Sequence, residues 1–252
     1  MCSSDLAFVI LNIRKQIVTA GWNIRPRIFC KISQWMKLMI QKNTYWKNIR
    51  AGDWNDWRWQ LKNLINEPEK LVEILKYLNI DDLKKVTSKY QFSITPYFLS
   101  LIDPENKFDP LAMQIIPDIS ELKSMKYLKS DPFDEEERKN GCEIIQRYPD
   151  RIVITVSNKC ASYCRYCTRK WMWNKNLVFD DKSLNKIVEF LKGNKKIREI
   201  IISGGEPFLL SIEFLDRILK SILSLPSIEV VRIGTRILSF LPQIITKKTV
   251  RM

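Results

Sequence analysis

The chain has 252 residues, of which 45% are hydrophobic and 28% are charged, and its formal net charge is +14. These proportions are those of an ordinary globular protein, and no apolar run approaches the roughly 18 residues that would span a bilayer, so a cytoplasmic protein without a membrane partner is expected. The sequence contains no histidine, which excludes histidine-based triads and HExxH zinc sites.

The basic residues are spread along the chain and do not form one stripe. A nucleic-acid partner is therefore not expected, and anionic small molecules are the better match for the positive charge. The six cysteines of a cytoplasmic chain indicate metal ligands or free thiols in preference to disulfides.

Residues 1–44 carry no clear domain signature and are left as an uncertain leader. The first six, Met-Cys-Ser-Ser-Asp-Leu, resemble a translated sequencing adapter, so residues 1–6 are not expected to be biological. A native start at Met36 or Met39 is an open alternative.

Residues 45–145 are predicted to form a helical N-terminal region that acts as a lid or packing layer. Asp53 is a candidate cap for a helix that begins at Trp54. Pro68 fits the first turn of a second helix, which runs to about residue 78. Further helices are expected from residue 81 to a point before Thr95-Pro96, and over about 119–128.

Residues 146–252 show a different pattern, in which short β-branched runs alternate with amphipathic segments. Strands are predicted at 152–156, 200–203 and 229–233, and helices at 182–191 and 212–223. This order indicates parallel βα units with right-handed crossovers. The predicted fold is α/β, a partial (β/α) barrel truncated after about three units, with an open sheet edge and an exposed apolar face that favour aggregation.

Three cysteines follow the first of these strands, in the segment Cys160-Ala161-Ser162-Tyr163-Cys164-Arg165-Tyr166-Cys167. Thiolates are the usual ligands of iron–sulfur clusters, and three on one loop can hold three irons of a [4Fe–4S] cluster while one iron stays open. A structural zinc site would need a fourth ligand, for which Cys142, Cys30 and Cys2 are the candidates. Unliganded buried cysteines are the remaining alternative.

The triplet resembles that of the radical S-adenosylmethionine (SAM) superfamily. Residues 45–252 resemble, more narrowly, the N-terminal part of the lysine 2,3-aminomutase family, through several blocks in the same order. The blocks are Trp54-Asn55-Asp56-Trp57, Ile94 to Pro104, Arg147-Tyr148-Pro149-Asp150-Arg151, Cys164 to Arg169, Ser203 to Pro207, Val231 to Arg236 and Leu241-Pro242-Gln243.

The resemblance implies a site for SAM on the open iron. Ser203-Gly204-Gly205-Glu206 would lie along its methionyl amine, with Glu206 accepting from the ammonium group. Tyr166, where the aminomutases often have histidine, would pack beside the cluster and the adenine. Arg236 is a candidate for the SAM carboxylate. The alternative for Ser203 to Glu206 is a turn at the end of a strand followed by an acidic residue at the start of a helix. The alternative for Arg236 is a surface charge.

The resemblance also implies a site for pyridoxal 5′-phosphate (PLP) and an amino acid. Arg147 and Arg151 would contact the PLP phosphate, a task suited to guanidinium groups, although a solvated basic pair is the alternative. Arg169 would contact the substrate carboxylate. The family's PLP-binding lysine would lie beyond Met252, so no catalytic residue is assigned.

The implied reaction moves an amino group from the α to the β carbon of an amino acid by way of a 5′-deoxyadenosyl radical and PLP, with an amino acid as the small-molecule partner. A reductant such as ferredoxin or flavodoxin and, at full length, a homo-oligomer are the other implied partners. The fragment alone is expected to be inactive, and the substrate is open among lysine, glutamate, arginine and a protein-bound lysine. The rival hypotheses are another radical SAM enzyme and a basic zinc-binding nucleic-acid module.

Overall fold

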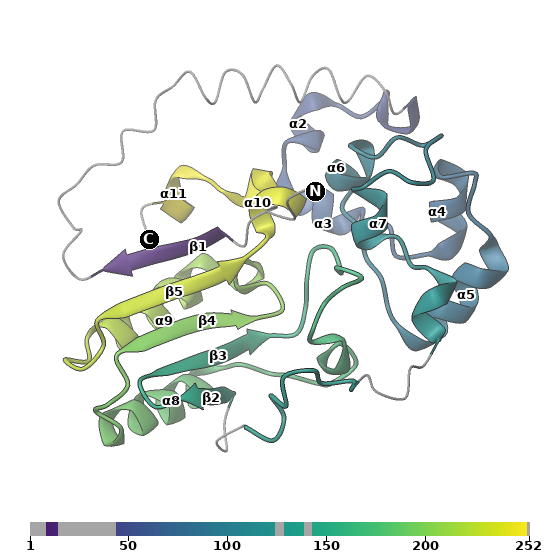
Figure 1. Cartoon of the computed structure of the whole chain (residues 1–252). Helices are drawn as coiled ribbons and strands as arrows, with labels where there is room; N and C mark the ends of the chain where they lie inside the picture. The colour runs from purple at the N-terminus through teal and green to yellow at the C-terminus, as the bar shows by residue number, and fades with distance from the viewer. Residues whose placement is uncertain (1–8, 15–43, 124–128, 139–142, 251–252) are drawn as a thin grey trace.

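The computed structural model describes residues 9–14, 44–123, 129–138 and 143–250. A five-stranded sheet in the order β1–β5–β4–β3–β2 lies at its centre, and most of the helices preceding β2 lie beyond the carboxyl ends of β3 and β4 (Figure 1). The strands are β1 (Val9–Arg14), β2 (Ile144–Tyr148), β3 (Arg151–Ser157), β4 (Glu199–Gly204) and β5 (Val230–Thr235).

The three inner strands are parallel, and each is joined to the next by a helix. In the register, Ile154 lies opposite Ile202, which in turn lies opposite Ile233. The connecting helices are α8 (Asp181–Gly193), capped by Asp180, and α9 (Ile212–Leu223), capped by Ser211. The predicted α/β class and its three strands and two helices are therefore confirmed.

Side-chain alternation explains why both helices lie on one face of the sheet. Ile152, Ile154 and Val156 of β3 are at most 1% exposed and belong to the same buried cluster as residues of α8 and α9. Their neighbours in the strand, such as Arg151 and Val153, point to the opposite face. That second face carries the polar groups of β3, β4 and β5.

The segment between residues 44 and 122 is helical and has a buried cluster of its own, which includes Trp54, Leu71 and Ile94. Its elements are η1 (Thr44–Trp46), α2 (Ala51–Trp54), α3 (Trp57–Lys62), α4 (Pro68–Ile74), α5 (Ile80–Lys89), α6 (Pro96–Ser100), α7 (Ala112–Ile115) and η2 (Ile119–Leu122). The remaining short elements are η3 (Lys170–Met172), η4 (Pro207–Leu209), α10 (Ile237–Phe240), η5 (Pro242–Ile244) and α11 (Lys247–Val250). The division of the chain into domains stays a prediction.

Three helix predictions are corrected. The cap of the tryptophan-rich helix is Asp56, whose carboxylate accepts from the Arg58 N–H at 2.9 Å, because the chain turns once after Trp54 and restarts at Trp57. The helix from Pro68 ends at Ile74, since Leu75 leaves the helical region with φ −113° and ψ 80°. The helix expected over 119–128 is only the 3₁₀ turn η2, because Lys123 is extended, and residues 124–128 lie outside the described part.

The described sheet is open, as expected, but its open edges lie at β1 and β2 and not at the parallel strands. β1, from the leader, pairs antiparallel with β5, and β2 pairs antiparallel with β3. Both outer edges of the parallel strands are therefore covered, and the expectation of aggregation stays a prediction. The described strands do not close on themselves, and the truncated barrel stays a prediction. None of the helices in the described ranges is long and apolar enough to cross a membrane.

The cysteine loop after β3 is held against the helical segment by a buried ion pair. Arg165 donates from Nε and Nη2 to Glu121 of η2 at 2.9 and 2.8 Å, and Lys170 donates to the same carboxylate at 2.6 Å. The Arg165 side chain is only 6% exposed and that of Glu121 is 11% exposed. Burial raises the pKa of Glu121, but hydrogen bonds from Arg165 and Lys170 outweigh it and the net shift is downward.

We expect Glu121→Gln to lower the free energy of unfolding by about 3 kcal/mol, because the change leaves a buried guanidinium without its charged partner. The folded pKa of Glu121 is below its ordinary value of 4.5, so its contribution is present above that pH and is lost as the pH falls through the folded pKa. Urea unfolding of both proteins across the acid range measures this. Glu67→Gln, which removes an exposed pair with Lys70, should cost less than about 1 kcal/mol. An equally small cost for both variants would show that the Glu121 pair does not anchor the loop.

Candidate functional site

A cavity of about 170 Å³ lies at the carboxyl ends of β3, β4 and β5. Parallel strands end at the same side of a sheet, so the loops that follow them meet there. The loop after β3 contributes the three cysteines, the turn after β4 contributes Gly204 to Glu206, and the end of β5 contributes Gly234 to Arg236. Phe240 of α10 and Tyr166 complete the wall.

Cys160, Cys164 and Cys167 all line this cavity and are partly exposed free thiols. Burial raises the pKa of the Cys160 thiol well above its ordinary value, while for Cys164 the nearby Arg236 opposes the same effect. Within the described ranges, no three histidine, cysteine, aspartate or glutamate side chains are grouped closely enough to hold a single metal ion. All three thiols line one cavity, as ligands of a shared cluster would. Cys2, Cys30 and Cys142, the proposed fourth zinc ligands, lie outside the described residues.

The turn after β4 requires glycine at two consecutive positions. Gly204 has φ +123°, and a Cβ there would lie 2.3 Å from the Ser157 carbonyl oxygen. A Cβ on Gly205 would lie 2.3 Å from the Lys159 carbonyl oxygen. Both contacts are far below van der Waals distance, so the glycines let the β4 turn pack against the start of the cysteine loop. The cavity wall there is backbone that a ligand can approach closely.

Glu206 joins the ends of β4 and β5. Its Oε1 accepts from the Thr235 hydroxyl at 2.6 Å and the Phe208 N–H at 3.1 Å, and its Oε2 accepts from the Arg236 N–H at 3.1 Å. The residue caps η4, so the plain alternative of a helix-start acid describes part of its role. Burial raises the pKa of its carboxyl, against the effect of these hydrogen bonds. Oε2 accepts only one of these three hydrogen bonds. It therefore keeps acceptor capacity for a ligand's ammonium group.

Arg236 and Tyr166 meet at the edge of the cavity. Arg236 donates from Nη1 to the Cys164 sulfur at 2.8 Å and to the Tyr166 hydroxyl, and from Nη2 to the Gln114 side-chain oxygen at 2.8 Å. Its guanidinium therefore faces a cysteine that was assigned to the cluster. The role of Arg236 toward a SAM carboxylate stays a prediction, as does that of Tyr166, which is 57% exposed.

Arg169 lines the same cavity on the β4 side. It donates from Nε and Nη2 to Glu135 at 2.6 and 2.7 Å, and from Nη1 to the Ser203 hydroxyl at 3.0 Å. Ser203, which was expected to lie near SAM, thus connects the turn after β4 to the arginine that was expected to bind substrate. Arg169 therefore lies within reach of a ligand in this cavity.

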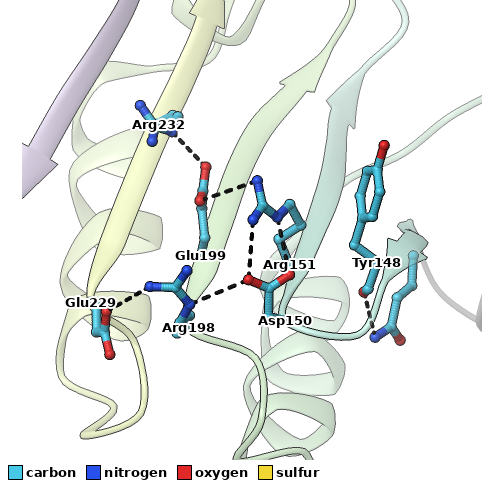
Figure 2. Close-up of polar contacts among 8 residues, drawn as sticks. Tyr148, Asp150, Arg151, Arg198, Glu199, Glu229 and Arg232 are labelled. Carbon is cyan, nitrogen blue, oxygen red and sulfur yellow. Dashed lines mark hydrogen bonds and ion pairs between the residues drawn. The ribbon is translucent and has the colours of Figure 1, made fainter.

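Arg147 and Arg151 line a second cavity of about 200 Å³, together with Arg138 and Glu135. The structure therefore brings the two arginines of the Arg-Tyr-Pro-Asp-Arg block to one space. Arg151 also donates to Asp150 at 3.1 Å from both Nε and Nη2 and lies 3.8 Å from Glu199 (Figure 2). Contact of this pair with a phosphate stays a prediction. In such a contact, the Arg151 guanidinium would bind the phosphate as well as these carboxylates.

Among the polar side chains that hold the site together, Gln114, Glu121 and Glu135 were not expected from the sequence. Glu135 stands in an acidic run, a pattern typical of a solvated segment, and yet it is only 8% exposed. Gln114 and Glu121 come from the helical segment, far from the cysteines along the chain. No local pattern indicates such contacts, because they depend on how two layers pack.

Residues 154–247 match the family model of the radical SAM superfamily. The chain is 34% identical to an L-lysine 2,3-aminomutase of Acetoanaerobium sticklandii, over 85% of the chain and 52% of that relative. It is 38% identical to an L-lysine 2,3-aminomutase of Methanococcus maripaludis, over 82% and 49%. It is also 35% identical to a glutamate 2,3-aminomutase of Clostridioides difficile, over 81% and 49%.

These comparisons confirm the resemblance predicted from the sequence: residues 154–247 match the radical SAM superfamily, and the chain is similar to lysine and glutamate 2,3-aminomutases. The chain spans about half the length of these relatives. The superfamily implies a [4Fe–4S] cluster and SAM, and the cavity with three thiols and a glycine turn fits both.

We expect the anaerobically reconstituted chain to be brown and to hold about four irons and four sulfides. Replacing Cys160, Cys164 or Cys167 by alanine should abolish the colour, because each removes one of three protein ligands. Cys142→Ala is the control and should retain the iron. Iron and sulfide analysis decides the matter, and an equal loss from Cys142→Ala would refute the three-ligand assignment.

Proposed function

From this homology, we propose that the protein is an amino-acid 2,3-aminomutase, an isomerase that moves an amino group from the α to the β carbon. The observation that carries the proposal is the meeting of three thiols, a glycine turn and a buried carboxylate at one cavity. The blocks around Arg147, Arg151 and Arg169 distinguish this proposal from a radical SAM enzyme of another kind.

Each group around the first cavity has a proposed task. Cys160, Cys164 and Cys167 hold the cluster, and the backbone of Gly204 and Gly205 lies against the methionyl part of SAM. Glu206 accepts a hydrogen bond from the SAM ammonium through Oε2, which has capacity for it. When bound, the reduced cluster and SAM would supply the radical that abstracts hydrogen, and PLP would hold the amino acid.

The cavity wall also separates this chemistry from water. Ile237 and Phe240 line it and are 0% and 4% exposed, and the Phe240 ring meets Phe98 of α6 edge-on at 4.8 Å. The Thr95 hydroxyl donates to the Phe240 carbonyl oxygen at 2.5 Å. The helical segment thus fixes an apolar side of the cavity, and exclusion of water protects a reactive intermediate from side reactions.

Arg169 is proposed to bind the carboxylate of the substrate, because a guanidinium matches a carboxylate in two parallel hydrogen bonds. Arg147 and Arg151 are proposed to contact the PLP phosphate from the second cavity, where Arg138 adds a third positive charge. No lysine of the described ranges lines either cavity. Covalent attachment of PLP is therefore assigned to none of the described lysines.

We expect a version of this protein with the full length of its relatives to form a β-amino acid from lysine, glutamate or arginine when given SAM, a reductant and PLP. Arg169→Lys in that protein should raise KM more than it lowers kcat, because the lysine loses the two-point contact with the carboxylate. The 252-residue chain alone should form no β-amino acid, since no described lysine lines either cavity.

Chromatographic assay of β-amino acids in both proteins provides the measurement, with 5′-deoxyadenosine as the check that SAM is cleaved. Cleavage of SAM without β-amino acid from any of the three substrates would favour a radical SAM enzyme of another kind. Turnover by the 252-residue chain would show that all the catalytic residues lie within it.

A further inference from the structure

The ion pair between Glu135 and Arg169 connects the linings of the two cavities. Arg169 lines the first with the cysteines, and Glu135 lines the second with Arg147 and Arg151. The Arg169 side chain is 17% exposed and that of Glu135 is 11% exposed. Charge-assisted bonds of 2.6 and 2.7 Å at such burial hold a guanidinium in one orientation.

The contacts use only part of the guanidinium. An arginine has five N–H donors, one on Nε and two on each terminal nitrogen. Glu135 takes the Nε edge, with one N–H of Nη2, and Ser203 takes one N–H of Nη1. One N–H remains on each terminal nitrogen, and the one on Nη2 points to the end of the guanidinium, because Glu135 occupies the Nε edge. That end suits a second carboxylate, which need not displace Glu135.

The backbone before Glu135 is adapted to this placement. Asp134 has φ +52° and is the one non-glycine residue with positive φ in the part of the chain that the structure describes. A non-glycine residue in this region costs about 1–3 kcal/mol and persists only where the surroundings impose it. The neighbours pair with lysines near the surface, Asp134 with Lys129 and Glu136 with Lys175, whereas Glu135 is buried.

We propose that Glu135 is a positioning residue for substrate recognition: it holds Arg169 side-on, so that the end of the guanidinium faces the carboxylate of an amino acid in the first cavity. This inference rests on the proposed function, which assigns that carboxylate to Arg169. Ser203 restrains the opposite side of the fork and thereby links the orientation of Arg169 to the turn that lies against SAM.

The test compares the affinities of the cluster-loaded chain for an amino acid and for its decarboxylated amine, by calorimetry in the presence of SAM and PLP. L-lysine is paired with 1,5-diaminopentane, and L-arginine with agmatine, while L-glutamate is paired with 4-aminobutanoate. The dissociation constant of the amine divided by that of the amino acid measures recognition of the α-carboxylate alone. A large ratio means that the carboxylate is recognised. A merely structural loss would weaken both ligands of a pair equally and leave the ratio unchanged.

Glu135→Gln should lower this ratio by about tenfold, because the amide cannot accept both N–H groups of the Arg169 edge. Glu135→Asp keeps the charge, so its ratio should stay closer to the wild-type value than that of Glu135→Gln. It replaces the glutamine variant in the test if that variant folds poorly. The matched control is Glu136→Gln, next in the chain and exposed, which should leave the ratio unchanged. In an Arg169→Lys background, Glu135→Gln should have no further effect, since it acts through the arginine.

Two contrary results are distinguishable. If the wild-type chain prefers no amino acid over its amine, Arg169 does not bind a substrate carboxylate in it, and the role proposed for Arg169 fails together with this inference. If the wild-type preference is present but Glu135→Gln and Glu135→Asp both retain it in full, the inference alone is overturned.

Discussion

The ion pair between Arg165 and Glu121 is the contact on which the geometry of the site depends. Arg165 lies between the second and third cysteines, so whatever fixes its side chain also fixes the loop. Its backbone N–H donates to the Gln114 carbonyl oxygen at 2.7 Å, and its Nη1 donates to the Gln91 carbonyl oxygen at 3.1 Å. The loop therefore takes its shape from the helical segment as much as from the sheet. A buried pair of this kind adds little net stability compared with an apolar contact, but it allows few alternative arrangements.

The sheet supplies the other half of the same cavity. Glu206 accepts hydrogen bonds from residues that follow β4 and from the end of β5. The glycine turn packs the end of β4 against the start of the cysteine loop. Farther down the polar face, Glu199 accepts from Arg232 at 2.6 Å and faces Arg151 (Figure 2). This row of alternating charges connects β3, β4 and β5, and its Arg151 lines the second cavity. Charged groups thus lie at the starts of the strands on this face, and the Arg169–Glu135 pair lies near the cluster loop.

The sequence predicted the sheet-forming half well, because buried parallel strands and amphipathic helices repeat with clear periods. It also predicted that the three cysteines, the glycine turn, Glu206, Arg169 and Arg236 would lie close together, through a resemblance that the comparisons confirm. The antiparallel edge strands β1 and β2 were not predicted, since short strands without a distinctive pattern are recognised only by their partners. Glu135 and Gln114 were missed for the same reason: their roles come from contacts between distant segments.

The central claim is that the three-thiol cavity leaves one iron open beside the carboxylate of Glu206. Electron paramagnetic resonance of the reduced, iron-loaded chain, recorded while SAM is added, tests it most directly. The account predicts that SAM changes the cluster spectrum of the wild-type chain, and that Glu206→Gln needs about tenfold more SAM for the same change, because it loses a charged acceptor. A spectrum that SAM leaves unchanged in folded, iron-loaded wild-type protein would contradict the account.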